Sequence, residues 1–206
     1  ESSIAKVGAP EALSAVRKAF ASQVRLRSAT VEDSPHRVHY VRTPGYFCQF
    51  WARTPTVRPQ GRRKTRPRGE LYSDAYADEL TQMAVVAVLN SSLFYYYIFA
   101  YSDCRHMNRR DVVEFPVDVA AFGRPLLKRL AKLGAELLAD YDSHVSWMNK
   151  SGLEIESFAA AESKPIMDEI DRVLAEHYGF TDEELDFIIN YDIKYRLGAD
   201  EGNGDE

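Results

Sequence analysis

The sequence predicts an α+β fold, in which a small, mainly antiparallel sheet with packed helices is followed by a helical C-terminal portion. Two observations predict this arrangement. Residues 37–73 contain short β-forming runs that alternate with period two between turn residues, and from residue 74 on the apolar residues recur at helical spacing. The 206 residues are 45% hydrophobic and 28% charged, which is typical of soluble proteins and sufficient for a core without disulfides.

In the front part of the chain, one helix precedes three short strands. Residues 10–25 place apolar side chains on one helical face, with a proline tolerated in the first turn. Residues 37–43 and 46–53 alternate as strands around a turn at Pro44-Gly45, and residues 69–73 supply a third strand. We expect these strands to form the sheet.

Two consecutive helices are expected next. Residues 74–89 form the first, with Ser73 as its N-cap, and residues 93–101 form the second, capped by Ser91 or Ser92. The second helix is apolar or aromatic at almost every position, which is typical of a helix buried on most sides. Its three consecutive tyrosines are therefore expected in the core rather than stacked on bases.

A long helix is predicted from Pro125 to about Trp147, and Gly152 breaks the helical pattern after it. Apolar side chains form a stripe along one of its faces: Leu126, Leu130, Leu133, Leu137 and Tyr141. We interpret this leucine stripe as a core face, with the docking of a partner as the alternative.

The last two helices carry capping signals. Ser163 and Gly179 are expected to cap a helix over residues 164–178 at its two ends. Thr181, with Glu184 three residues later, predicts a capping box for the final helix.

Charge is distributed unevenly along the chain. The formal net charge is −5, to which residues 1–69 contribute +10 and residues 70–206 contribute −15. Residues 34–69 contain no acidic residue and nine basic ones: Arg37, Arg42, Arg53, Arg58, Arg62, Arg63, Lys64, Arg66 and Arg68. We interpret them as phosphate ligands, because eight are arginines, whose planar fork matches phosphate. The alternative is a solvated basic loop, and residues 54–69 are expected to be mobile under either interpretation.

Elimination leaves no catalytic motif. No two of the nine prolines are adjacent, so the Asp/Asn-Pro-Pro-aromatic element of amino methyltransferases is absent. The one Gly-x-Gly lies at residues 202–204 in the acidic tail, which excludes a nucleotide-binding turn. Two acid-x-Lys runs, at residues 162–164 and 192–194, and a few separated histidines and cysteines are interpreted as chance matches. We expect no catalytic and no metal-binding residue here.

One segment has a more specific pattern. Asn90-Ser91-Ser92-Leu93-Phe94-Tyr95-Tyr96-Tyr97 is followed by Ser102-Asp103-Cys104-Arg105-His106-Met107-Asn108-Arg109-Arg110-Asp111 and by Glu114-Phe115-Pro116. This segment resembles the target-recognition region of adenine-specific DNA methyltransferases from type II restriction-modification systems, including bifunctional restriction enzymes. The run from Ser163 through Asp168-Glu169-Ile170-Asp171 to Arg196 is similar to the C-terminus of the same proteins. The matches cover about residues 37–196.

The resemblance implies sequence-specific recognition of double-stranded DNA. The methyl-transfer domain, with its S-adenosylmethionine, would lie upstream of Glu1 as a partner in the same protein, and this part of the chain would need no cofactor. The implied organisation is a target-recognition region over residues 1–123 with its basic loop at 54–69, a helical region over 124–198 and a disordered acidic tail at 199–206.

Base reading requires side chains with forked donors or amides. Those that directly follow the aromatic helix are Arg105, Asn108, Arg109 and Arg110. The alternative is that Asp103 and Asp111 hold these side chains in caps and surface ion pairs.

Two other functions stay open. The acidic tail and the leucine stripe could dock another restriction-modification subunit, or the acid-x-Lys runs could belong to a nuclease. A membrane span is not expected, because the longest apolar run, Leu93 to Tyr101, is far shorter than the roughly 20 residues required. The chain contains only two cysteines, which predicts reduced thiols in a cytoplasmic protein.

Overall fold

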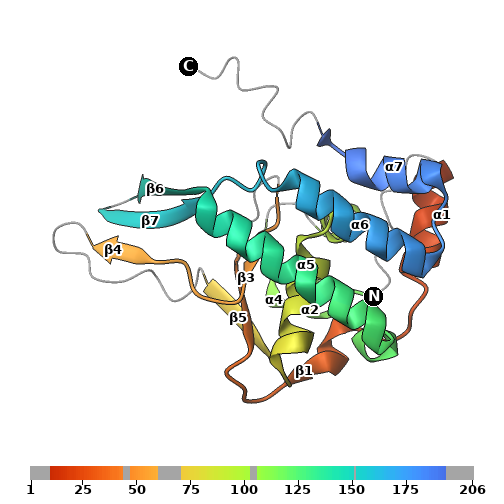
Figure 1. Ribbon diagram of the computed structural model, residues 1–206, viewed down its shortest axis with the longest axis horizontal. Helices are drawn as coiled ribbons and strands as arrows, with labels where there is room; N and C mark the ends of the chain where they lie inside the picture. The colour runs from red at the N-terminus through yellow and green to blue at the C-terminus, as the bar shows by residue number, and fades with distance from the viewer. Residues whose placement is uncertain (1–9, 44–46, 60–70, 103–105, 151, 194–206) are drawn as a thin grey trace.

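The predicted α+β fold is confirmed. The computed structural model describes residues 10–43, 47–59, 71–102, 106–150 and 152–193. Within these ranges, the chain forms a four-stranded and a three-stranded antiparallel sheet together with packed helices. Figure 1 shows the three-stranded sheet extending away from the helices, whereas the four-stranded sheet lies against them.

The four-stranded sheet contains a strand in each of the three regions predicted from the sequence, although the run expected at 46–53 forms a strand only at Phe50–Trp51. Its strands are β1 (Thr30–Val31), β2 (Arg37–Val41), β3 (Phe50–Trp51) and β5 (Leu71–Tyr76), in the order β1-β5-β2-β3. Tyr40 pairs with Phe50 on one side of β2 and with Tyr72 on the other. The predicted turn at Pro44-Gly45 lies outside the described residues, but the antiparallel pairing of β2 with β3 agrees with it.

The three-stranded sheet, which we call the wing, joins the front and back parts of the chain. Its strands are β4 (Val57–Pro59), β6 (Val145–Lys150) and β7 (Leu153–Phe158), in the order β4-β7-β6. Gly152 connects β6 to β7 with φ 77°, a conformation that favours glycine. Pro59 pairs with Leu153 beside this turn, so β4 ends at the tip of the wing.

The helices pack around one buried helix, α2 (Glu79–Asn90). They are α1 (Pro10–Ala19), α2, α3 (Ser92–Tyr101), α4 (Arg109–Val113), α5 (Arg124–Ser143), α6 (Lys164–Tyr178) and α7 (Asp182–Asn190), with short 3₁₀ turns η1 (Leu26–Ala29) and η3 (Val119–Ala121). Helix α2 contacts β2, β3 and β5 on one side and α5 and α6 on the other. It therefore links the sheet to the C-terminal helices.

Aromatic side chains fill the core around α3, as its composition predicts. Phe94 packs edge-on against Phe50 of the sheet and against Phe115. On the opposite side, Tyr96 contacts Phe187 and Tyr191 at the end of the chain's last helix. The tyrosines of α3 are thus core residues rather than a stacking surface for bases.

Three predicted helix boundaries are wrong. The helix expected at 74–89 begins only at Glu79, with Asp78 as N-cap, because residues 71–76 form strand β5, which pairs with β2 and β1. The long helix ends at Ser143 rather than near Trp147, since residues 145–150 pair with β7. Helix α1 ends at Ala19, not at Arg25.

Part of the predicted mobile loop is also a strand. Residues 57–59 of the expected loop at 54–69 form β4, because β7, almost a hundred residues further along the chain, provides their hydrogen-bond partners. Residues 60–69 lie outside the described part of the chain. The boundary expected between residues 123 and 124 stays a prediction, although β4 pairs with β7 across it.

No single helix in the described ranges is long and apolar enough to cross a membrane. Helices α2 and α3 pass such a test only when taken together, and their axes bend by 61° at Ser91.

The close approach of α2 and α5 gives a testable expectation at Gly134. A Cβ atom added to Gly134 would lie 2.2 Å from the carbonyl oxygen of Met83. Replacing glycine by alanine inside a helix normally stabilises by about 1 kcal/mol. Here we expect Gly134→Ala to lower the free energy of unfolding by about 3 kcal/mol or more, because the two helices must separate. Urea denaturation measures the change.

Gly123→Ala is the matched control. The nearest atom to its added Cβ would be in the ring of Pro125, two residues later, at 3.7 Å. We expect a change below about 1 kcal/mol for this variant. A Gly134→Ala protein as stable as the wild type would contradict the packing of α2 on α5.

Candidate nucleic-acid interface

The described residues include seven of the thirteen predicted DNA-binding residues: Arg37, Arg42, Arg53, Arg58, Asn108, Arg109 and Arg110. The other six lie outside the described part of the chain: Arg62, Arg63, Lys64, Arg66, Arg68 and Arg105. The seven fall into two groups, one beside the four-stranded sheet and one on the wing.

The first group forms where α4 meets the sheet. The amide of Met107 donates to the carbonyl of Arg42, 2.8 Å away, just past the end of β2. Two residues later, Arg109 reaches Asp74 on β5. These contacts bring together the predicted phosphate ligand Arg42 and the predicted base readers Arg109 and Arg110, which are more than sixty residues apart in the sequence.

Asp74 is the buried centre of this group. Its side chain is 2% exposed, and its Oδ1 accepts from Arg109 Nε at 2.7 Å and lies 2.6 Å from Nη2. Its Oδ2 accepts from the hydroxyl of Tyr40 at 2.9 Å. Burial, and after it the negative charge of Asp74, raises the pKa of Tyr40 far above its usual range. The hydrogen bond to Asp74 likewise raises the pKa of Arg109.

The other residues at this end of α4 have different roles. Asn108 is the N-cap of α4 and forms a capping box with Asp111, whose carboxylate accepts from the Asn108 amide at 2.8 Å. This is the alternative role that the sequence left open for Asn108. Arg110 is exposed, and no carboxylate in the described residues lies within ion-pair distance of it.

Arg37 lies on the opposite face of β2 from Tyr40. Its Nε donates to the hydroxyl of Ser73 on β5 at 3.1 Å, and its carbonyl accepts from Gln82 of α2 at 2.6 Å. Arg37 is therefore partly engaged in holding the sheet on α2.

Arg53 lies between β3 and the wing, and the chain's own acidic residues hold it there. Its guanidinium donates to both oxygens of Glu156, at 2.7 and 2.8 Å, and to Asp142 at 2.6 Å. The hydrogen bond to Arg53, aided by the amide of Thr56, lowers the pKa of Glu156 to about 2. Arg53 is thus the clearest case in which the acidic back part of the chain neutralises the basic front part.

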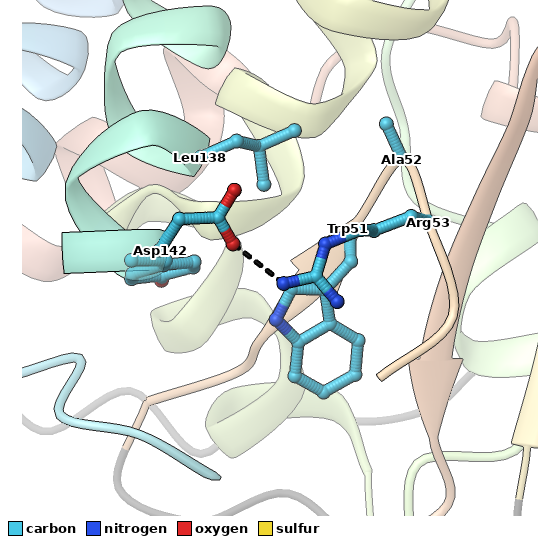
Figure 2. A pocket seen from close by; sticks show the side chains of 6 residues that line it. Trp51, Ala52, Arg53, Leu138 and Asp142 are labelled. Atoms are coloured by element: carbon cyan, nitrogen blue, oxygen red, sulfur yellow. Dashed lines mark hydrogen bonds and ion pairs between the residues drawn. The ribbon is translucent and has the colours of Figure 1, made fainter. Parts of the chain in front are cut away.

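A small pocket lies beside this ion pair. Figure 2 shows Arg53 reaching toward Asp142, with Trp51 and Leu138 among the other residues that line the pocket. Its volume is about 240 Å³, below the roughly 300–1,000 Å³ of sites for drug-sized ligands. The indole nitrogen of Trp51 is buried without a hydrogen-bond partner among the described residues and is not reached by solvent. We interpret the pocket as a packing defect rather than a binding site.

Arg58 stacks on an exposed aromatic ring. Its guanidinium carbon lies 3.6 Å from the ring centre of Trp147, which is 36% exposed. Glu154 faces Arg58 across the β4-β7 pairing, yet no ion pair joins them. Arg58 is exposed and directly precedes the strand's end at the tip of the wing.

The path of the chain connects the two groups. The sequence between Pro59 and Leu71 contains five of the basic residues, and its two ends are placed by the fold. One end leaves the tip of the wing after Arg58, and the other enters β5 at Leu71, which pairs with Val41 beside Arg42. Both groups are therefore adjacent to the most basic part of the sequence.

The residues proposed for other chemistries are used within the fold. The leucine stripe of α5 packs on α2, with Leu130 and Leu137 fully buried. Lys164 of one acid-x-Lys run pairs with Asp168 on the next turn of its own helix. No cluster of three or more metal-ligating side chains occurs among the described residues.

Sequence reasoning missed one organising residue in each group: Asp74, which holds Arg109, and Trp147, on which Arg58 stacks. The sequence predicts a helix at Asp74 and the end of another helix at Trp147. The signal for them was the β-forming residues of the runs 71–76 and 145–150, such as Tyr72, Tyr76 and Val145. Runs this short do not separate a strand from a helix by periodicity.

Comparisons of this chain with protein-family models, with curated proteins and with solved structures find no match.

The Arg53–Glu156 pair predicts a pH dependence. Because the pKa of Glu156 falls from 4.5 to about 2 on folding, its stabilising effect is complete above about 4.5 and is lost as the pH falls toward 2. We expect Glu156→Gln to lower the free energy of unfolding by about 1–2 kcal/mol at pH 7, since solvent screens the half-exposed Arg53. The difference from wild type should vanish near pH 2, as measured by urea denaturation across this range.

Glu154→Gln on the same strand is the control, since Glu154 forms no ion pair with a described residue. A Glu156→Gln difference that persists unchanged at pH 2 would show that the pair does not stabilise through charge.

Proposed function

We propose that this chain binds double-stranded DNA, as the recognition part of an adenine-specific restriction-modification methyltransferase or restriction enzyme. The proposal is supported by the placement of three arginines that form no ion pair with a carboxylate of the described residues. Arg42 and Arg110 lie beside the entry of the basic segment into β5, and Arg58 lies where that segment leaves the wing.

Unpaired surface arginines of this kind are suited to phosphate. Like charges gathered on one part of a protein repel each other, and a polyanion relieves that repulsion while releasing its own counterions. Lys18, Arg27 and Arg129, by contrast, are already paired with Glu184, Glu114 and Glu176. Arg17, Arg25, Arg37, Arg124 and Lys128 also have no ion pair with a described carboxylate. What distinguishes Arg42, Arg58 and Arg110 is their place beside the two ends of the basic segment.

The alternative function, a protein-docking module, has less support, because the leucine stripe proposed for docking is part of the core. Because the leucine stripe is covered by α2, a partner would need another surface. DNA binding needs no such surface, since phosphate contacts require exposed cations rather than an apolar face.

Methyl transfer would belong to a companion domain upstream of residue 1, together with S-adenosylmethionine. The chain has no adjacent prolines with which to grip an adenine amine, and its one Gly-x-Gly lies in the C-terminal tail. The proposed protein would act in the cytoplasm, where a restriction-modification enzyme meets DNA.

Salt dependence tests the proposal. Six phosphate contacts would give a slope of about −5 for log affinity against log salt concentration. We expect the triple variant Arg42→Ala, Arg58→Ala and Arg110→Ala to reduce the magnitude of this slope by about 2–3, since each lost contact removes about 0.9. Fluorescence anisotropy with a labelled duplex measures the slope between low and physiological salt.

The matched control removes the same charge elsewhere. Arg129→Ala, Lys132→Ala and Arg172→Ala replace three exposed cations on α5 and α6 that already have acidic neighbours. We expect the control triple variant to keep the wild-type slope. No detectable duplex binding at low salt, or equal slopes for both triple variants, would overturn the proposal.

A further inference from the structure

We propose that Arg109 reads a guanine in the major groove of the bound duplex, and that Asp74 and Tyr40 are positioning residues that aim its guanidinium. This inference rests on the proposed DNA binding and adds to it the residue that provides base preference.

The first observation is that Arg109 combines a fixed guanidinium with an exposed side chain. The side chain is 57% exposed, while Nε and Nη2 both lie within 2.7 Å of Oδ1 of Asp74. Asp74 therefore occupies the Nε–Nη2 edge of the planar group. The Nη1–Nη2 edge is the second fork of an arginine, and no other acceptor among the described residues contacts it.

The second observation is that the carboxylate itself cannot move. Asp74 is on β5, paired with Val38, and the hydroxyl of the fully buried Tyr40 holds its other oxygen at 2.9 Å. A surface arginine normally loses side-chain entropy when it binds a ligand. Arg109 has already lost much of that freedom in the free protein, so it is pre-oriented for a directional contact.

Charge argues for a base edge over a phosphate. The neighbouring carboxylate offsets the positive charge of Arg109, which weakens its attraction to a phosphate. Hydrogen bonding to a neutral acceptor pair depends instead on geometry. Guanine presents O6 and N7, two acceptors that a guanidinium fork matches, and the other bases present no such pair in the major groove.

The adjacent Arg110 is the natural contrast. It is exposed on the same short helix but has no carboxylate to orient it among the described residues. Arg110 is therefore suited to a phosphate, whose contact provides no base preference, whereas Arg109 is oriented for a directional contact with a base.

Selection from a randomised duplex library with the 206-residue chain, followed by affinity measurements on the selected motif, tests the assignment. Each guanine of the motif is replaced in turn, and the loss of affinity is measured for wild type, Arg109→Lys and Arg110→Lys. We expect one guanine whose replacement costs the wild type about tenfold to a hundredfold. In Arg109→Lys that loss should fall below about threefold, because lysine keeps the charge that Asp74 needs but not the fork. Arg110→Lys should match the wild type.

The positioning residues are tested in the same assay. Asp74→Asn and Tyr40→Phe should reduce discrimination at that guanine severalfold while binding to an unrelated duplex stays within about twofold of wild type. A purely structural role would lower both affinities together, and thermal melting checks that each variant is folded.

Two results would overturn the assignment and leave DNA binding standing: a wild type that binds duplex DNA but selects no guanine-containing motif, or an Arg109→Lys variant with wild-type discrimination at every guanine. If the wild type binds no duplex at low salt, the proposed function fails as well.

Discussion

The fold depends on a buried polar junction between α2 and α3. Asn90 donates to the carbonyl of Phe50 and accepts from the Phe50 amide and the Tyr141 hydroxyl, which fixes β3 and α5 on α2. Ser91 caps α3, and Asp171 of α6 accepts from the amides of Ser92 and Leu93. Buried polar groups are costly unless they are satisfied, so these bonds specify one arrangement of sheet and helices.

This junction also brings together the two distant motifs on which the proposed family resemblance rests. The Asn90-Ser91-Ser92-Leu93-Phe94 element and the element that contains Asp171 are separated by about eighty residues, yet they contact each other directly. Both elements are structural: they orient the aromatic helix that precedes residues 106–110. The resemblance therefore concerns the scaffold, and the proposed DNA contacts lie on residues that the scaffold positions.

Charge is divided between structure and surface. Acidic residues of the back part neutralise Lys18 and Arg53, and Asp74 orients Arg109. Arg42, Arg58 and Arg110 have no such partner among the described residues, and they lie beside the ends of the basic segment. A net charge of −5 thus conceals exposed cations that have no acidic partner among the described residues.

The sequence alone determined the local features. The capping box at Thr181 and Glu184, the left-handed cap at Gly179, the cap at Ser91 and the burial of the aromatic helix all depend on residues within a few positions of one another. The tertiary structure decided the rest. Residues 57–59 and 145–150 became strands only because β7 was available, and Arg53 and Arg109 gained partners on distant elements. Strand pairing and ion pairing over such distances follow from packing, which periodicity within a short window does not contain.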